Sequence, residues 1–371
     1  MSDASTAGHD VAIVGGGPAG LAVAIGAALQ GLSVVVLEHR ASPVDKACGE
    51  GLMPAGLACL DRLGVRGLLD PSGVWPIRTI CYVQEDGSRA EASLPGEGGL
   101  GVRRTTLADA LLRRAREVGV SVRHEVTVRA HERSAAGVVL HTSAGDLAAR
   151  MLVAADGLAS PLRRAAGLDT PPAPLRRLGL RQHFRCAPWS PTVEVHFAAG
   201  LEAYVTPAGP GRVGVAFLWE DGQLAGPPTM PALLARFPAL AARLYGVSID
   251  SRPQGAGPLL RGARARVLDR FALVGDAAGY VDALTGEGLS IALASAEALV
   301  GLLPRALAAG ATAASLAPYE RLWRRTFAHY AFVAHATLVL ARRPWLRRPV
   351  VRLLGRWPAL FRVVLAWAVG G

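Results

Sequence analysis

The sequence contains few cysteines and a single lysine, and both scarcities narrow the possible classes of protein. Its four cysteines include no Cys-x-x-Cys pair, which argues against a zinc ribbon and against a disulfide-stabilised scaffold. Lys46 is the only lysine among 40 basic residues, a bias that says little about function. The first ten residues carry two acidic side chains and no arginine or lysine, so we expect no signal peptide and a cytoplasmic location.

The composition is that of a folded chain whose positive charge is gathered near one end. Of its 371 residues, 51% are hydrophobic and 19% are charged, which excludes a disordered protein. This length predicts one large domain or two interleaved ones. Residues 318–371 hold ten arginines and one acidic residue, Glu320, so they carry most of the net charge of +11. Because the rest is nearly neutral and no recognition motif accompanies the arginines, we expect no nucleic-acid binding.

The longest uncharged stretch, Val11–Leu37, is long enough to span a bilayer, but its middle argues against a membrane helix. The residues at 15–20 read GGGPAG, a turn sequence. They separate a short apolar strand, Val11–Val14, from an alanine-rich helix, Leu21–Leu29. A second β-branched strand follows at Ser33–Leu37. The pattern therefore predicts a β-turn-α-β unit.

The middle of the chain changes character and then returns to the first pattern. A breaker, Thr170–Pro174, precedes several short strands between Gly179 and Trp219 whose spacing predicts an antiparallel sheet. Phe271–Val274 is again a short buried strand, and a helix follows over 288–303. The other elements that periodicity predicts are a helix over 107–118 and strands over 120–130, 138–141 and 149–155.

This order predicts a mixed α/β fold with an added antiparallel β-sheet. We expect a discontinuous Rossmann-type domain from residues 1–75, 100–175 and 255–303. A substrate domain built on the antiparallel sheet, residues 76–99 and 176–254, interleaves with it. Residues 304–371 form a basic, helical C-terminal segment.

The turn at residues 15–20 fits the Gly-x-Gly-x-x-Gly pattern of dinucleotide-binding sites. Gly15 permits the tight turn, Gly17 lets the backbone approach a pyrophosphate, and Gly20 lets the helix pack closely on the strand. The helix N-terminus offers unpaired N–H groups to phosphates. Glu38 ends the second strand, where a carboxylate can bind the ribose hydroxyls of an adenosine. The spacing therefore predicts a bound dinucleotide.

Two further strand-and-turn segments extend this site. Asp276 follows the strand Phe271–Val274, where its carboxylate can bind a ribityl hydroxyl and so favours FAD over NAD. Gly286 and Gly288 open the next helix, whose N-terminus can face the flavin. The alternative is that Asp276 only caps this helix. The third segment, Asp156-Gly157, is by spacing an ordinary turn, with Ser160 as helix N-cap before Pro161.

These three motifs, in this order, resemble one flavoprotein superfamily over residues 10–300. The chain is similar to the FAD-dependent aromatic hydroxylases and geranylgeranyl reductases with the p-hydroxybenzoate hydroxylase fold. The resemblance implies that Glu38 binds the adenosine ribose, that Arg104 contacts the cofactor, and that Asp276 binds the ribityl chain. It also implies that Asp156 lies near the FAD and a transient NAD(P)H. The cofactor-binding residues expected are Gly15, Gly17, Pro18, Ala19, Gly20, Glu38, His39, Arg40, Arg104, Val126, Asp156, Gly157, Gly275, Asp276, Gly286, Gly288 and Leu289.

The motifs point in two directions within the superfamily. The residues after Asp276 and the loop Asp45–Gly51 resemble the geranylgeranyl reductases, which place a Cys-Gly loop beside the flavin. The aromatic Tyr-x-Trp-x-Phe-Pro signature of those reductases is absent, since Tyr204–Pro207 shares only its tyrosine and proline. The Trp-x-Trp-x-Ile-Pro signature of tryptophan halogenases is also absent. The motifs therefore fit both subgroups, the hydroxylases and the geranylgeranyl reductases.

No catalytic residue and no metal site can be assigned from the sequence. Cys48 is the candidate nearest the flavin; the alternative is a small buried hydrophobic residue. His183 and His196 lie on predicted strands without a partner at metal or triad spacing, so ordinary half-buried histidines are expected. The candidates for the substrate pocket are Cys48, Gly49, His183, Tyr204 and Pro207.

We therefore expect an FAD-dependent oxidoreductase that takes electrons from NAD(P)H and acts on a hydrophobic small molecule. A monooxygenase acting on an aromatic or polyketide-like substrate ranks first, and a reductase of isoprenoid or activated C=C bonds is the alternative. A flavoprotein that docks on or modifies a partner protein is a second alternative.

The basic C-terminal segment allows two interpretations. It interleaves arginines with four of the seven tryptophans, the pattern of a segment at a membrane surface, which would place the protein at the inner face of the membrane. The alternative is a set of helices packed on the fold with solvated arginines. Its last uncharged run, Val363–Gly371, is too short to span a bilayer.

Overall fold

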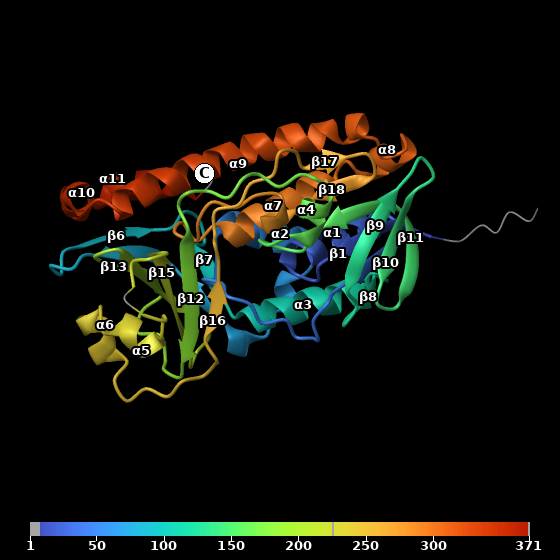
Figure 1. The fold of residues 1–371 in the computed structure, drawn as a ribbon. Helices are drawn as coiled ribbons and strands as arrows, with labels where there is room; N and C mark the ends of the chain where they lie inside the picture. The colour runs from blue at the N-terminus through green and yellow to red at the C-terminus, as the bar shows by residue number, and fades with distance from the viewer. Residues whose placement is uncertain (1–7, 225, 370–371) are drawn as a thin grey trace, which may run out of the picture.

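The computed structural model describes residues 8–224 and 226–369, and it consists of two sheet-based halves spanned by one long helix (Figure 1). The expectation about a signal peptide falls mainly on residues 1–7, which lie outside the described residues. The combination of a largely parallel sheet, an antiparallel sheet and C-terminal helices confirms the predicted fold class.

The first half is built on an eight-stranded sheet whose central strands are parallel. The order is β17-β18-β11-β1-β2-β8, and β9 and β10 form a hairpin on β11. Every residue of β2 is buried, as expected for a strand covered on both faces. Helices α1 (Pro18–Leu29), α3 (Arg104–Glu117) and α7 (Gly288–Val300) pack around this sheet. The strands are β1 (His9–Val14), β2 (Val34–Leu37), β8 (Ser121–Arg123), β9 (Val128–Arg133), β10 (Val138–Thr142), β11 (Gly145–Ala154), β17 (Val267–Leu268) and β18 (Phe271–Leu273).

Two of the predicted elements differ from those observed. The single strand expected over 120–130 is two strands, β8 and β9, because Glu125 takes the left-handed conformation, with φ +59°, and interrupts the extended backbone. The helix expected over 288–303 ends at Val300, and a separate short helix, α8 (Leu303–Ala308), follows.

The second half is a seven-stranded sheet in the order β16-β12-β15-β14-β13-β5-β6, antiparallel except for the β13–β5 pair. Helices α5 (Met230–Leu234) and α6 (Pro238–Arg243) share a core with one face of it. The other face looks towards the first half. The strands are β5 (Thr79–Val83), β6 (Arg89–Ser93), β12 (Arg177–Phe184), β13 (Thr192–Ala198), β14 (Leu201–Pro207), β15 (Val213–Glu220) and β16 (Gln254–Ala256).

Short elements complete the two halves. A three-stranded sheet has the strand order β3 (Gly51–Leu52), β7 (Gly99–Val102), β4 (Val74–Ile77). Helix α2 (Pro54–Arg62) packs on α7, and α4 (Pro161–Ala165) follows β11. The domain boundaries drawn from the sequence stay a prediction, because sheet membership does not show which segments fold as units.

The C-terminal segment is helical and packs on both halves. Helix α9 (Ala313–Ala341) contacts α7 and β17 near its start, while Leu338 near its end joins a cluster with Leu218 of the seven-stranded sheet. Helices α10 (Pro344–Arg356) and α11 (Pro358–Ala368) pack on β6. Within the described residues, no helix is both long and apolar enough to cross a membrane.

Candidate functional site

In the glycine turn after β1, the fold requires a glycine at two positions but leaves room for a side chain at a third. A Cβ on Gly15, which has φ +112°, would lie 2.3 Å from the carbonyl oxygen of Ala155. A Cβ on Gly20 would lie 2.0 Å from the Gly15 oxygen. On Gly17 a Cβ would meet only Nη2 of Arg104, at 3.7 Å, so the space above this residue is free for a ligand.

The start of α1 is prepared for an anion. Pro18 occupies the first helical turn, no side chain caps the helix at Gly17, and no acidic residue lies in that turn. The first N–H groups of a helix lack intrahelical acceptors and carry partial positive charge. Together with the open space above Gly17, these groups form a cradle for a phosphate.

Glu38 lies beside this turn with its carboxylate fixed by backbone groups. The N–H of Gly16 donates to Oε2 at 2.7 Å, and the N–H of Arg40 donates to Oε1 at 2.9 Å. The side chain is only 5% exposed, while His39 and Arg40 beside it are exposed. Val126 donates its N–H to the Glu38 carbonyl at 3.0 Å. The structure thus brings these four predicted residues together at the ends of β2 and β8.

Three buried polar atoms on residues that line the same cavity as Gly17 have no hydrogen-bond partner among the described residues. They are Nη1 of Arg104, the first residue of α3, Nε of Arg181 and Oγ1 of Thr285. An orphaned guanidinium nitrogen over an open glycine turn is what a phosphate-bearing ligand requires. The residues present therefore fit FAD.

Asp276 follows β18 and also lines the cavity. Gly275 before it has φ +62°, and residues 275–277 form a short 3-10 helix whose N-cap is Val274. In the described part of the chain, no hydrogen bond reaches the Asp276 carboxylate, so it does not cap a helix. Helix α7 begins later, at Gly288, and Gly286, Gly288 and Leu289 line the cavity at its start.

In contrast to Asp276, Asp156 accepts hydrogen bonds at both carboxylate oxygens from residues at the start of α4. Ser160 Oγ donates to Oδ1 at 2.6 Å, and the N–H of Leu162 donates to Oδ2 at 3.0 Å. The N–H of Arg163 donates to Ser160 Oγ, so Ser160 is the predicted N-cap. Burial raises the pKa of Asp156 above its ordinary value. Gly157, next in sequence, lines the cavity.

Glu287 precedes α7 as its N-cap and is 5% exposed. Its side chain makes no capping hydrogen bond. Burial raises the pKa of this carboxyl from 4.5 to about 7. The carboxyl is therefore half protonated near neutral pH.

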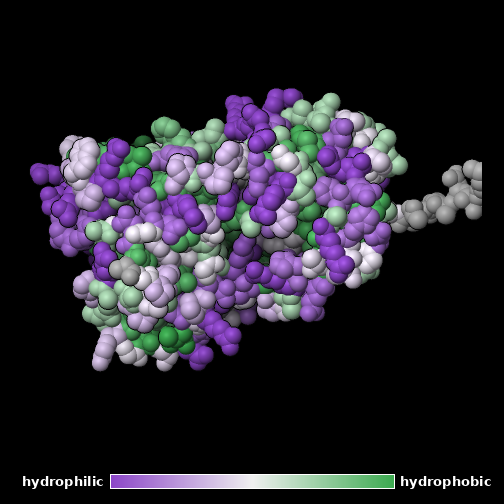
Figure 2. All heavy atoms as spheres, in the orientation of Figure 1, coloured by the Kyte–Doolittle hydropathy of each residue, from purple (hydrophilic) through white to green (hydrophobic). Residues whose placement is uncertain are grey.

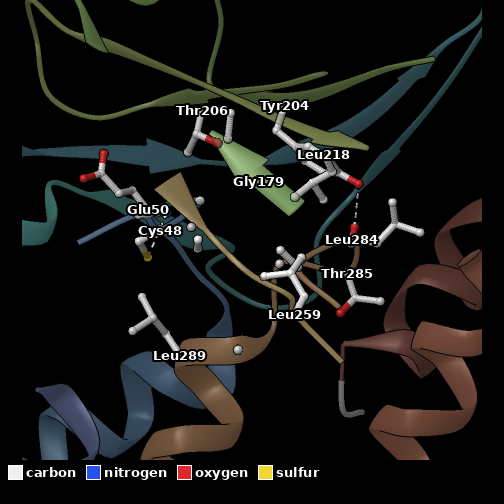
Figure 3. Close-up of a pocket in the computed structure, with 18 of the residues that line it drawn as sticks. Cys48, Glu50, Gly179, Tyr204, Thr206, Leu218, Leu259, Leu284, Thr285 and Leu289 are labelled. Carbon is white, nitrogen blue, oxygen red and sulfur yellow. Dashed lines mark hydrogen bonds between the residues drawn. The ribbon is translucent and has the colours of Figure 1, made fainter. Parts of the chain in front are cut away.

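The cavity extends from the glycine turn towards the seven-stranded sheet, and most of its far wall is apolar. Figure 3 shows Tyr204, Thr206 and Leu218 on the sheet side, across from Cys48 and Leu289. The Tyr204 hydroxyl donates its hydrogen bond to the Leu284 carbonyl at 3.1 Å, so its proton already has an acceptor within the protein. The apolar lining comes from the sheet, from loops and from the C-terminal helices: Ile80, Tyr82, Val193, Val195, Ala216, Leu218, Leu259, Leu284, Val333, Leu365, Ala368 and Val369.

Of the predicted pocket residues, Cys48, Gly49 and Tyr204 line this cavity, whereas His183 and Pro207 are not in its lining. His183 is fully buried behind the wall, so it is neither half-buried nor at the pocket surface. Sequence reasoning missed the lining from Val333, Leu365 and Val369. These apolar side chains carry no chemical signal, and only the packing of α9 and α11 brings them to the site.

A buried ionic network supports the loop that carries Cys48. Glu50 lies between two glycines with φ +59°, and its N–H donates to Cys48 Sγ at 3.3 Å. Its Oε1 accepts hydrogen bonds from Arg103 Nη1 at 2.9 Å and from the N–H of Arg104 at 2.8 Å. Its Oε2 lies 2.6 Å from Nε2 of His183. Figure 3 shows the Glu50 carboxylate turned away from the cavity.

The network fixes the proton positions of its members. Burial acts to raise the pKa of Glu50, but the hydrogen bond from His183 and the charges of neighbouring arginines hold it below its ordinary value. Burial lowers the pKa of His183. Because Arg181 Nη1, 2.9 Å from Nδ1 of His183, can only donate, Nδ1 is the acceptor and Nε2–H donates to Glu50. Burial also raises the pKa of Cys48, so its thiol keeps its proton at neutral pH.

A second buried ion pair joins the two halves near the cavity. Arg177 on β12 donates to Glu202 at 2.8 Å and to Asp282, in the loop before α7, at 3.0 Å. All three side chains are almost fully buried. His196, the other predicted histidine, lies 2.8 Å from Glu194. Among the described residues, no group of three His, Cys, Asp or Glu side chains could hold a metal ion.

Comparison with known proteins places similar chains among flavoenzymes. Residues 8–197 match the family described as "FAD binding domain". The chain is 30% identical over 318 residues to menaquinone reductase of Mycobacterium tuberculosis, covering 79% of this chain and 76% of that protein. It is 29% identical to digeranylgeranylglycerophospholipid reductase 2 of Methanopyrus kandleri, covering 86% of this chain and 83% of the relative.

Solved structures show the same fold. A geranylgeranyl bacteriochlorophyll reductase-like protein from Thermoplasma acidophilum superposes with a TM-score of 0.82 at 21% identity, covering 97% of this chain and 96% of the other. p-Nitrophenol 4-monooxygenase from Pseudomonas putida gives a TM-score of 0.80 at 22% identity, covering 96% of each chain. At these identities the similarity concerns the fold alone, and it includes proteins named for different reactions.

Proposed function

The chain belongs to the superfamily of FAD-dependent oxidoreductases with the p-hydroxybenzoate hydroxylase fold, and from this premise we propose that it reduces a carbon–carbon double bond in an apolar, isoprenoid-like chain. The observation that carries the proposal is the cavity, which leads from the glycine turn into a wall of aliphatic side chains. Burial of an extended apolar chain there is favourable, at about 25 cal/mol per Å² of apolar surface removed from water. The curated relatives named as reductases support the same choice.

Each part of the site has a role in this proposal. The N-terminus of α1 and Arg104 would hold the pyrophosphate, Glu38 the adenosine ribose, and Asp276 the ribityl chain. When bound, FAD supplies the hydride, and NAD(P)H is the proposed source of electrons. The start of α7, at Gly288, faces the cavity and would orient the flavin. The aliphatic wall would hold the substrate chain and exclude water from it.

The proton that accompanies hydride transfer needs a donor, and the cavity lining holds several candidates, among them Lys46, Cys48 and Tyr204. The Tyr204 hydroxyl is tied to Leu284, and burial raises its pKa well above the ordinary value. Cys48 lines the cavity and keeps its proton at Sγ. Among these groups we propose that Cys48 lies beside the reacting atoms, because the buried Glu50 network supports the loop that carries it.

A monooxygenase, ranked first from the sequence, is the second candidate. The missing aromatic signature at Tyr204–Pro207 favours it, as does the fold shared with p-nitrophenol 4-monooxygenase. The third possibility, a flavoprotein that docks on or modifies a partner protein, stays a prediction from the sequence.

The experiment follows reduction of the flavin and then identifies the product. The FAD-loaded protein is mixed with NADH or NADPH without oxygen, and the flavin absorbance is followed. Polyprenyl lipids or lipophilic phenols are then added, with and without oxygen, and the masses of the products are measured by mass spectrometry. A gain of two hydrogens without oxygen supports the reductase. A gain of one oxygen atom, only in air, supports the monooxygenase, and absence of flavin reduction by either nicotinamide supports the docking protein.

Two matched variants test whether the cavity binds the substrate. Leu218→Trp places a larger side chain in the apolar wall and should abolish turnover of long chains while FAD binding is retained. Leu29→Trp makes the same change at the exposed end of α1, where we expect no effect on turnover. Unchanged turnover in the Leu218 variant would contradict the assignment of the cavity.

A further inference from the structure

The large hydrophobic side chains that remain exposed are concentrated on the C-terminal helices. Of the fourteen in the described residues, nine lie in α9, α10 and α11, and a tenth, Trp357, lies between α10 and α11. Three are tryptophans: Trp345 is 73% exposed, Trp357 60% and Trp367 51%. Scattered exposed hydrophobic residues need no explanation, but a concentrated set marks an interaction surface.

The exposed residues form one side of helices whose other side is packed. On α11, Phe361 and Leu365 are buried against the seven-stranded sheet, four residues apart. Leu360, Val363, Val364 and Trp367 recur at three- and four-residue spacing on the opposite side and are 42–67% exposed. We call this side, together with Trp345, Leu353 and Trp357, the outer face. The outer face is apolar even though the buried side of these helices already provides the packing that holds them on the protein.

Arginines flank the outer face and acidic residues do not. No aspartate or glutamate occurs after Glu320. Some arginines of these helices are paired with the body, as Arg352 is with Asp86. Arg343, Arg356 and Arg362 are exposed and form no ion pair with the described residues. The left end of the molecule in Figure 2, where Figure 1 places α10 and α11, shows hydrophilic surface beside pale and hydrophobic areas.

This combination narrows the choice of partner. Indole rings favour the headgroup level of a bilayer, and guanidinium groups bind lipid phosphates. A protein partner of matching acidity would also bind arginines and tryptophans, so the choice between the two partners depends on what lies beneath the outer face. A lipid surface with negative charge satisfies both.

The cavity adds a reason for a lipid surface at this place. Val333 and Thr337 of α9, Leu365 and Ala368 of α11, and Val369 directly after α11 line the cavity from inside. Val364 and Trp367 of α11 lie on the outer face, so a single helix separates the outer face from the apolar cavity. The wall of the cavity nearest the outer face is thus made of the same helix that would touch the bilayer.

We infer that the outer face of α10 and α11 docks on an anionic lipid bilayer. Docking places the α9–α11 wall of the cavity at the membrane surface, where an apolar chain would pass from lipid to the flavin site. The docking rests on the exposed side chains alone, whereas the passage of a substrate through this wall rests on the proposed function.

The experiment is sedimentation of the full, FAD-loaded chain with vesicles. The wild type should sediment with phosphatidylglycerol-containing vesicles at low salt, bind pure phosphatidylcholine vesicles weakly, and be released at high salt. Arg343→Gln, Arg356→Gln and Arg362→Gln combined should weaken binding on the order of a hundredfold. The matched control combines Arg116→Gln, Arg129→Gln and Arg305→Gln, exposed arginines elsewhere, and should bind like the wild type.

A second variant tests the aromatic contribution. Trp345→Ala, Trp357→Ala and Trp367→Ala combined should lose binding and the blue shift of tryptophan fluorescence that the wild type shows with vesicles. Equal losses in both arginine variants would overturn the inference, because net charge alone would then explain binding. Failure of the wild type to bind, or its self-association through the outer face in place of vesicle binding, would also overturn it. No substrate is present, so this result is independent of whether the proposed reduction occurs.

Discussion

Replacing Glu287 with glutamine should stabilise the protein in a pH-dependent way. The carboxyl is buried at the start of α7, and burial raises its pKa from 4.5 to about 7. A tenfold change in a protonation equilibrium is worth about 1.4 kcal/mol, so ionising Glu287 in the folded state costs about 3 kcal/mol more than in the unfolded state. Interaction with the helix N-terminus typically opposes this cost by about 0.3–1 kcal/mol, so the cost of burial dominates.

The sign follows from proton binding. Between the two pKa values the folded protein holds the Glu287 proton and the unfolded chain does not, so stability falls as pH rises through this range. Glutamine keeps the shape of the side chain and cannot ionise. The variant should equal the wild type near about pH 4.5 and exceed its free energy of unfolding by about 2–3 kcal/mol above about pH 8.

Urea unfolding of the FAD-loaded protein at a series of pH values measures this difference. Glu297→Gln is the matched control, because Glu297 lies on the same helix, is 44% exposed and pairs with Arg62. Glu297→Gln should lower the free energy of unfolding only slightly, and it should not become more stable than the wild type at high pH. If the difference between Glu287→Gln and wild type does not change with pH, Glu287 is not held protonated and the reasoning fails.

Three further predictions concern the cofactor site and the buried network. Gly17→Val should abolish FAD binding without loss of fold, because a side chain there meets open space rather than backbone; a variant that purifies with normal flavin content would contradict the site. Asp276→Ala should weaken FAD retention, measured by flavin release on dilution, and leave the unfolding temperature of the FAD-free protein nearly unchanged; a large fall in that temperature with unchanged affinity would indicate a structural role. His183→Gln should reduce acid sensitivity. Its pKa is lowered by burial, so its contribution to stability is present above the unfolded value of about 6.5 and is lost as pH falls through the folded value. Thermal unfolding from neutral to mildly acidic pH checks this, and an unchanged slope would contradict it.

The parts of the site that the sequence predicts are those encoded by local pattern. The glycine turn, the strand before Glu38 and the Ser160 cap depend on neighbouring residues, so spacing and residue type were enough. Arg104 was identified only through the resemblance. Glu125 was missed as a strand breaker, because a glutamate gives no local signal of a left-handed backbone.

The rest depends on contacts between distant residues. Glu50 and His183 meet only because β12 runs behind the loop of residues 45–51. Their pairing makes His183 part of a buried ionic network, whereas the sequence predicts a half-buried histidine without a partner. Three side chains lie within hydrogen-bond distance of His183. Arg181 is two residues away, but Glu50 and Ser251 come from distant segments and could not be paired with His183 before the fold was known. The apolar cavity wall was equally hidden, since Val333 and Leu365 look like any other helix residues.

The position of these wall residues has a consequence for how selectivity can change. The residues proposed to hold the flavin all lie between Gly15 and Leu289, whereas α9 and α11 contribute lining residues from Val333 onwards. Substitutions, insertions or deletions within α9–α11 can therefore change the shape of the cavity while the residues proposed to hold the cofactor stay the same. Evolution, or a protein engineer, can retune the length of chain that fits by grafting α9–α11 from one relative onto another.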